Sequence, residues 1–570
     1  MMPLFDTPRM GASGSTGAYT IDQSIRFNDN DSAYLARTPG TAGNRKTWTF
    51  SCWVKRASLF NGSAAQVILS AGDGGANDVV MQFGQSDDTL RISDYESGTA
   101  SNLIPTQLFR DVGAWYHFVL AYDTTQGTAA NRIKLYVNGS QVTAFGTEIY
   151  PSLNNDLPIN STIPHNIGRG AYSANGYFDG YLAEINFIDG TAAAPTAFGE
   201  FNDDGVWIPK AYSGAYGDQG YYITGATAAA LGTDFSGNSN TYTSSGLATT
   251  DQMLDTPTTN YPTFSPVFDY STSGTVAYYR PNYAVSTLSD GNLNLDYNTP
   301  NTSMHYCTMA FPTSGKFYWE VTATVKGGVV IGIGGSGNVE DGIGTTSSTA
   351  MANVIGYYHD GKLYDELATT ATYGNATALA NTEYVGVAYD VDNDAIWFCD
   401  NGTWVDGNGT DSSATVLTEI EAGTTTSAAS TGFTANHNHW FPCTAAVGDY
   451  PTVVANFGQS SFTGAAPSGF TDLNSNTLPT PAIADGTAHF QTTLYTGSTS
   501  AFDVTFGGNS DLAPDFLWFK ARSAASNNFL FDIARGVLKK IESDRTAAEV
   551  TSTGSMTAFG TNGFSLGDGG

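Results

Sequence analysis

Short runs of apolar residues, many of them alternating with polar ones, recur along this chain and are separated by Gly, Asn and Asp. In Thr47–Val54 the side chains of Trp48, Phe50, Cys52 and Val54 share one face, because successive side chains of a strand point to opposite sides. Short strands joined by turns at this spacing are typical of β-sandwiches. Strands of the same kind are predicted in the first part of the chain at Ser24–Phe27, Trp115–Tyr122, Ile133–Val137 and Tyr177–Ile188.

The same pattern continues to the C-terminal end, with turns marked by Asn-Gly and Asp-Gly pairs. Asn138-Gly139 predicts a type I′ hairpin turn, because both central residues of that turn need a positive φ. Arg535–Val550 is the one helix-like stretch, and Gly536 near its start weakens that prediction. Further strands or hairpins are predicted at Lys316–Val321, Val329–Ile333, Ile355–Tyr364, Tyr384–Tyr389, Ala395–Trp404, Val453–Gly458, Asp515–Arg522 and Asn528–Ala534.

The spacing of these strands divides the chain into five parts, with repetition at the level of whole domains. We expect an extended N-terminal arm at 1–20, a β-sandwich at 21–210, a connector rich in Gly, Thr and Asn at 211–265, a second β-sandwich at 266–470 and a smaller β-rich module at 471–570. That module ends just after an apolar strand, so we expect either further chain or a partner to complete its sheet.

Composition agrees with an all-β fold and excludes several functions. The chain has 570 residues, enough for three to five domains, and its 23 basic and 53 acidic residues give a net charge of −30. Such a chain is repelled by nucleic acid and by anionic membranes. The first ten residues hold no apolar secretory segment, and no run of about 18 apolar residues predicts a membrane span.

The four cysteines are widely spaced and form no CxxC pair. A disulfide scaffold or a zinc site needs closely arranged partners. We therefore predict four free thiols, three or four of them in strands, at Cys52, Cys307, Cys399 and Cys443. Free thiols fit a protein that is made and assembled in a cytoplasm.

Four ordered segments carry a resemblance to a known superfamily: TWTFSCWVK, WYHFVLAYD, IKLYVNG and FDGYLAEINFIDG. Together they resemble the laminin-G/concanavalin-A-like lectins over about 190 residues. This resemblance implies a two-sheet jelly roll whose members mostly bind carbohydrate or protein, sometimes through calcium, and occasionally hydrolyse glycans.

Two further resemblances concern the rest of the chain. KFYWEV, followed by VVIGI and VGVAYDVDNDAIWFCDNGTW, resembles the SPRY domain and implies a second concanavalin-like sandwich used for recognition. PDFLWFKARSAASNNFLFDIARG resembles a C-terminal module common in tail-fibre-like proteins of bacteriophages. The expected fold class is therefore all-β, with serial concanavalin-like jelly-roll sandwiches and a smaller β-rich C-terminal module.

The closing strand of the first sandwich holds the nearest match to a catalytic motif. Laminarinase-like jelly rolls carry an E-x-D-x-x-E motif, and the nearest match here runs from Glu184 through Asn186 to Asp189. An Asn cannot take the acid–base role, and fold alone does not confer chemistry. We therefore expect no enzymatic activity.

Two acidic loops offer hard oxygen ligands for calcium. The candidate ligands are Asp29, Asp31, Asp73 and Asp78. Asn and Asp also populate tight turns without any metal, so both interpretations stay open. Asp390, Asp392 and Asp394 have EF-hand-like spacing but lack the Gly and the closing Glu, which argues against calcium there. His437 and His439 form the one close histidine pair, with no further ligand nearby to complete a zinc site.

Aromatic side chains in predicted loops could stack on the apolar face of a sugar ring. These are Tyr172, Tyr177, Tyr212, Tyr216, Tyr221 and Trp404. In an all-β protein most aromatic side chains belong to the core, and the sequence does not separate the two roles.

Taken together, these features favour a bacteriophage tail fibre or related virion appendage that adheres to host-surface glycans, with calcium as the one candidate cofactor. We expect a homotrimer that attaches to other virion tail proteins through the arm at 1–20 and is assembled in the host cytoplasm. Several weak sites on one particle would raise avidity by about 10²–10⁴. One alternative is a structural or capsid-decoration component without glycan affinity, and another is a polysaccharide depolymerase.

Overall fold

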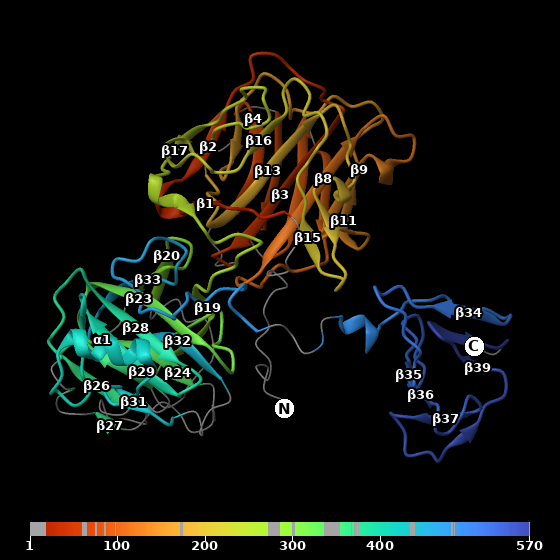
Figure 1. Cartoon of the computed structure of the whole chain (residues 1–570). Coiled ribbons are helices and arrows are strands. Elements are labelled where there is room, and N and C mark those ends of the chain that lie inside the picture. Colours follow the sequence, from red (N-terminus) through yellow and green to blue (C-terminus); the bar gives the residue numbers. More distant parts are fainter. Residues whose placement is uncertain are drawn as a thin grey trace. The chain divides into compact units, whose positions relative to one another are not determined.

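The structure is a computed structural model in which two compact units are distinguished: Met1–Glu200 with Ile208–Pro479, here the sandwich unit, and Phe201–Trp207 with Thr480–Gly570, here the C-terminal unit. Nearly all regular elements are strands, which confirms the predicted all-β fold class (Figure 1). The structure describes residues 19–59, 65–74, 77–84, 87–96, 99–171, 175–271, 286–298, 303–335, 354–365, 368–369, 373, 376–433, 439–479, 483 and 485–568. Most of the predicted arm at 1–20 lies outside these ranges.

The first sandwich pairs two eight-stranded sheets around one apolar core. In the first sheet the order is β10 (Ser140–Gln141), β9 (Ile133–Val137), β8 (Trp115–Asp123), β3 (Thr47–Arg56), β13 (Gly180–Asp189), β1 (Ser24–Phe27) and β18 (Gln252–Met253), with β16 (Tyr221–Ile223) pairing β13. In the second sheet it is β11 (Phe145–Ile149), β7 (Thr99–Pro105), β6 (Leu90–Glu96), β5 (Asn77–Phe83), β4 (Gln66–Gly72), β12 (His165–Ile167), β2 (Tyr34–Arg37) and β17 (Thr243–Ser245). The alternating side chains predicted in β3, including Trp48 and Phe50, pack in this core.

The second sandwich is built in the same way from later strands. One sheet has the order β19 (Phe264–Ser271), β22 (Ser303–Cys307), β32 (Trp440–Ala446), β24 (Val329–Gly335), β25 (Val354–Tyr358), β26 (Lys362–Asp365) and β27 (Ala368–Thr369). The other has the order β20 (Ser286–Ser289), β21 (Asn294–Tyr297), β33 (Thr452–Asn456), β23 (Lys316–Val325), β28 (Glu383–Asp390), β29 (Ala395–Asp400) and β30 (Thr403–Trp404), with β31 (Ser430–Thr431) pairing β29.

Residues 211–265, predicted as a connector, supply β16, β17 and β18 to the sheets of the first sandwich. A further two-stranded sheet joins β14 (Gly199–Phe201) and β15 (Trp207–Pro209). The C-terminal unit contains two small sheets: β34 (Phe502–Thr505), β40 (Gly563–Leu566) and β39 (Met556–Phe559) form one, and β35 (Phe516–Phe519), β36 (Phe529–Asp532), β37 (Lys539–Glu542) and β38 (Val550–Thr551) form the other.

The helix prediction was wrong. Residues 535–550 contain β37 and β38, and Gly536 adopts a φ of +84° that interrupts any helix. The α-helix of the described chain is α1 (Ser413–Ala422), which Ser412 caps at its start and Gly423, with a φ of +72°, ends. Its buried residues Val416 and Ile420 are four apart, as one face of a helix requires.

Other local predictions are confirmed. Asn138 and Gly139 both have positive φ values, 46° and 77°, as a type I′ turn requires. All four cysteines are free and buried, and each lies in a strand.

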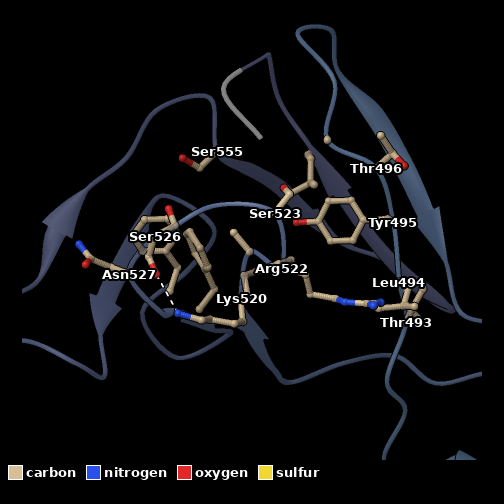
Figure 2. A pocket seen from close by; sticks show the side chains of 16 residues that line it. Thr493, Leu494, Tyr495, Thr496, Lys520, Arg522, Ser523, Ser526, Asn527 and Ser555 are labelled. Carbon is tan, nitrogen blue, oxygen red and sulfur yellow. Dashed lines mark hydrogen bonds between the residues drawn. The ribbon is translucent and has the colours of Figure 1, made fainter. Parts of the chain in front are cut away.

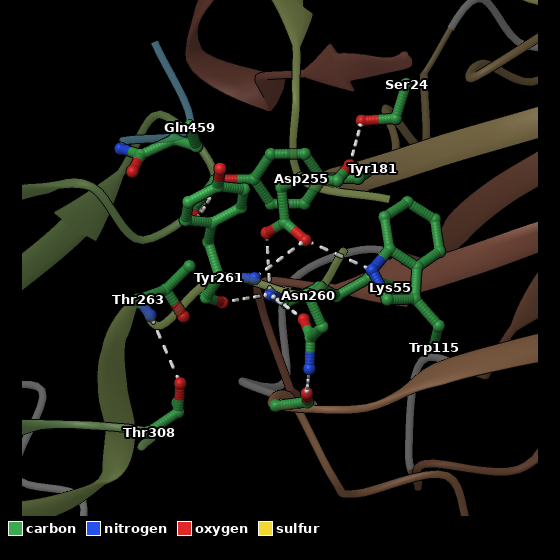
Figure 3. Close-up of polar contacts among 12 residues, drawn as sticks. Ser24, Lys55, Trp115, Tyr181, Asp255, Asn260, Tyr261, Thr263, Thr308 and Gln459 are labelled. Atoms are coloured by element: carbon green, nitrogen blue, oxygen red, sulfur yellow. Dashed lines mark hydrogen bonds and ion pairs between the residues drawn. The ribbon is translucent and has the colours of Figure 1, made fainter. Parts of the chain in front are cut away.

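A buried polar joint links β3 to the segment that leads into the second sandwich (Figure 3). The Lys55 ammonium donates to Asp255 at 2.6 Å, to the Asn260 side-chain oxygen at 2.8 Å and to the Tyr261 carbonyl at 2.8 Å. The Trp115 indole donates to the other Asp255 oxygen at 3.1 Å. The Lys55 and Asp255 side chains are each 1% exposed, so this ion pair is held entirely away from water.

Candidate functional site

The closing strand β13 of the first sandwich carries a bulge at Glu184. Its register against β3 shifts between Ala183 and Asn186, and Glu184 has a φ of +51°. A positive φ is uncommon for a residue with a side chain and is backbone strain that the surrounding structure must hold. A bulge adds one residue to a strand and turns a side chain to a new direction. Leu182 and Ile185 face the core, whereas Glu184 meets a group of tyrosines.

Glu184 is buried and fully engaged by hydroxyl donors. Tyr222 donates to one carboxylate oxygen at 2.6 Å, and Tyr19 donates to the other at 3.0 Å. Burial raises the pKa of Glu184 above its usual value, although both hydroxyls favour the charged form. Asn186 extends the network, because its amide donates to the Glu184 carbonyl and its oxygen accepts from Tyr216 at 2.8 Å.

The tyrosines form a row of rings, here called the tyrosine ladder: Tyr212, Tyr216 and Tyr222. Tyr216 and Tyr222 are stacked with centroids 6.1 Å apart, and Tyr212 meets Tyr216 edge-on at 5.0 Å. Phe198, which is buried, stacks beneath Tyr212 at 5.1 Å. All three ladder residues are half-buried. A row of braced rings beside fixed carboxylate and amide groups can stack on a sugar ring and bind its hydroxyls.

The aromatic residues that the sequence offers as candidates for stacking on sugar lie in different parts of the structure. Tyr212 and Tyr216 are part of the ladder, whereas Tyr221 is 3% exposed in the first core and Trp404 is 4% exposed in the second sandwich. Tyr177 packs against Tyr34, and Tyr172 lies outside the described residues.

Sequence reasoning missed Tyr19 and Tyr222 and did not connect Glu184 with aromatic residues. The adjacent pair Tyr221-Tyr222 was the available signal, because neighbouring strand residues point to opposite sides. If one ring packs in the core, the other must face outward.

The two carboxylates of the weak catalytic match, Glu184 and Asp189, are held by different partners. Asp189 accepts from the Asn44 backbone and the Asn160 amide, each at 2.7 Å, and from the Gln219 backbone at 3.0 Å. Asp189 therefore fixes the loops that contain its three donors. Glu184, in contrast, is held by Tyr19 and Tyr222. Glycoside hydrolysis needs two carboxyl groups flanking one bond, and the bonding partners of this pair are entirely different.

The first candidate calcium loop is a short 3₁₀ turn, η1 (Asp29–Asp31), with both acids exposed. Asn28 caps the turn, and its amide donates to Asp31 and to Asp290, each at 2.9 Å. Near it lies Asp179, which is 4% exposed. Burial, together with Asp29 and Asp290, raises the pKa of Asp179 well above its usual value.

In the second loop Asp73 accepts from the Asn77 amide at 2.7 Å. Burial, and then the charge of Asp73, raises the pKa of Asp78 to about 6. Within the described ranges, no group of three or more His, Cys, Asp or Glu is arranged to hold a metal ion. Calcium at Asp29, Asp31, Asp73 and Asp78 therefore stays a prediction, and the contacts seen there are those of tight turns. His437 lies outside the described residues, so the histidine pair with His439 is not placed.

Comparison with family models gives two matches. Residues 28–195 match a model described as the concanavalin A-like lectin/glucanases superfamily. Residues 485–570 match a domain of unknown function, DUF7483. A comparison with curated proteins found no match. No described helix is both long enough and apolar enough to cross a membrane.

Three solved structures are similar to parts of this chain. The SPRY domain of human HERC1 is 12% identical, with 35% of this chain and 99% of that chain covered and a TM-score of 0.23. A heptameric SAP-like pentraxin from Limulus polyphemus is 17% identical, covering 31% and 80%, with a TM-score of 0.24. Domain 4 of the arabinanase AbnA from Geobacillus stearothermophilus, in complex with arabinotriose, is 14% identical, covering 28% and 66%, with a TM-score of 0.21.

At TM-scores this low, these likenesses carry no argument. The family match is the stronger finding; it includes Glu184 and Asn186, whereas the ladder residues Tyr212, Tyr216 and Tyr222 lie beyond its end. Residues 28–195 are therefore similar to the concanavalin A-like lectin/glucanases superfamily.

Proposed function

We propose that this protein is a non-catalytic adhesin that binds neutral, hydroxyl-rich glycans through the tyrosine ladder of its first sandwich. The ladder beside Glu184 and Asn186 is the observation that carries this proposal. Its rings offer an apolar stacking surface, while the buried carboxylate and amide fix the hydroxyls of Tyr216, Tyr222 and Tyr19. Fixed hydroxyls and half-buried rings suit a neutral sugar better than a charged ligand.

The biological setting of the proposal is a bacteriophage virion appendage that adheres to host-surface polysaccharide. The resemblance of the C-terminal residues to a module of tail-fibre-like proteins supports this setting, as does the lectin-like first sandwich. The protein would be assembled in the host cytoplasm as a homotrimer, with the arm at 1–20 attached to other tail proteins. Copies arranged in this way would add avidity to individually weak sites.

The test is binding of the fluorescently labelled full chain to an array of bacterial surface polysaccharides and to intact bacteria. Tyr216→Ala removes the central ring of the ladder, which contacts both neighbouring rings and Asn186. We expect it to weaken binding at least about tenfold, which corresponds to about 1.4 kcal/mol.

The matched control is Tyr450→Ala, because Tyr450 is 51% exposed and lies in the second sandwich, away from the ladder. It should bind like the wild type. Equal binding by both variants would exclude the ladder as the site. A correctly folded wild type that binds no polysaccharide and no cell would favour the structural role instead.

A further inference from the structure

The C-terminal unit contains an open groove of about 960 Å³ that is separate from the tyrosine ladder (Figure 2). This volume is at the upper end of the ~300–1,000 Å³ typical of ligand sites. Its lining includes Tyr495, Phe519, Lys520 and Arg522, together with Ser and Thr hydroxyls and the Asn527 amide. The lining holds no Asp or Glu, although the chain as a whole has a net charge of −30.

Most Lys and Arg side chains of this unit form ion pairs, and the remaining two line the groove. Residues 480–570 contain six Lys or Arg and nine Asp or Glu. Four of the six cations pair with acids: Arg535, Lys539, Lys540 and Arg545 contact Asp532, Glu542 or Glu549. The other two, Lys520 and Arg522, make no ion pair within the described residues, and both line the groove. Lys520 donates to the Ser526 carbonyl at 2.9 Å, which fixes its ammonium at the groove wall.

An aromatic surface lies beside these cations. Tyr495 is 41% exposed, and its ring is braced by Phe519 at 6.3 Å and by Phe564 at 5.8 Å. Figure 2 shows Arg522 extending beneath Tyr495 toward Thr493 and Leu494, while Lys520 points toward Ser526. The groove therefore presents cations, hydroxyls and a braced ring to the same space.

We propose that this groove binds an acidic saccharide. A carboxylate or phosphate of the sugar would meet Arg522 and Lys520, because a guanidinium matches the geometry of both anions. A sugar ring would pack on Tyr495, and its hydroxyls would bind the Ser, Thr and Asn side chains. The proposal does not use the tyrosine ladder, so it stands or fails independently of the proposed function.

The experiment measures binding of the full chain to polygalacturonate, phosphorylated dextran and unmodified dextran by calorimetry. Comparison of the first two distinguishes a carboxylate from a phosphate ligand. We expect at least one of them to bind, and dextran to bind at least tenfold more weakly in this groove. The double variant Lys520→Gln/Arg522→Gln should lose at least tenfold in affinity for the acidic polymer. Tyr495→Ala should weaken binding severalfold.

The matched control is Lys539→Gln/Arg545→Gln, which makes the same change in charge within the same unit but outside the groove. It should bind the acidic polymer like the wild type. Equal loss in both double variants, or equal binding of the non-sugar polyanion polyglutamate, would mean general charge attraction and would overturn the proposal. Failure of both acidic polysaccharides to bind a folded wild type would overturn it as well.

Discussion

The sandwich unit and the C-terminal unit differ in where they place some of their charged groups. The sandwich unit hides a complete ion pair, Lys55 with Asp255, whose side chains are each 1% exposed. The C-terminal unit leaves Lys520 and Arg522 without acidic partners in its described part and exposes Trp518 at 64% and Phe490 at 74%. Its core is small, with seven buried apolar residues: Val504, Phe506, Leu517, Phe531, Met556, Phe564 and Leu566.

This difference concerns the role that charged groups have in each unit. Groups buried in the sandwich unit stabilise its fold, because a buried charge must be paired. Unpaired cations and exposed rings contribute little to the fold of the C-terminal unit. In the sandwich unit Lys55 and Asp255 therefore serve the fold, whereas Lys520 and Arg522 of the C-terminal unit are available to contact a ligand.

The largest expected effect is on the buried joint. Lys55→Met leaves the Asp255 carboxylate buried without its cation, and we expect a loss of about 3–5 kcal/mol in the free energy of unfolding. Urea unfolding followed by tryptophan fluorescence measures it. Lys210→Met is the control, because Lys210 and Glu200 form an exposed pair with side chains 49% and 51% exposed; its loss should stay below about 1 kcal/mol. Equal losses would contradict the role assigned to the joint.

A smaller effect is expected in the C-terminal unit. Leu517→Ala removes a core side chain that is 7% exposed and should cost about 2–4 kcal/mol. Its neighbour Trp518 faces the other side of β35, so Trp518→Ala should cost about 0.5 kcal/mol or less. Scanning calorimetry should show one lowered transition in Leu517→Ala and the other unchanged. If both transitions moved together, the two units would unfold as one body and the comparison would fail.

The smallest expected effect concerns pH and the second calcium loop. The pKa of Asp78 is about 6 in the folded protein and about 3.9 in an unfolded chain, so ionisation disfavours the fold as pH rises between these values. Asp78→Asn should therefore stabilise the protein by about 1–2 kcal/mol at pH 7.5 after allowance for solvent screening, with the gain vanishing near pH 4. Chemical unfolding at both pH values measures it.

Calcium binding at the second loop would reverse the expected effect of Asp78→Asn. If the loop bound calcium, the ion would favour the charged carboxylate, and adding it would raise the melting temperature of the wild type. Asp78→Asn would then destabilise the calcium-loaded protein. That sign would support the calcium prediction and exclude simple turn chemistry at this loop.

Local sequence signals predicted much of the fold. The alternation in β3 and the Asn-Gly pair at 138–139 each depend on neighbours along the chain, so both could be recognised directly. The prediction of a helix at 535–550 was wrong for a related reason. Residues 535–550 were interpreted as helix-like, but Gly536 was the stronger signal, while the Ser412 cap and Gly423 stop around α1 were overlooked.

By itself, the sequence determined the all-β class, the positions of most strands and turns, and the four free thiols. The tertiary structure decided the sites. Tyr19 and Glu184 are 165 residues apart along the chain, and Lys55 and Asp255 are 200 apart. Strand and turn signals act between near neighbours, whereas such contacts depend on how the sheets and loops pack. Alternation shows that a side chain leaves the core, but only the packed fold decides which distant groups meet it there.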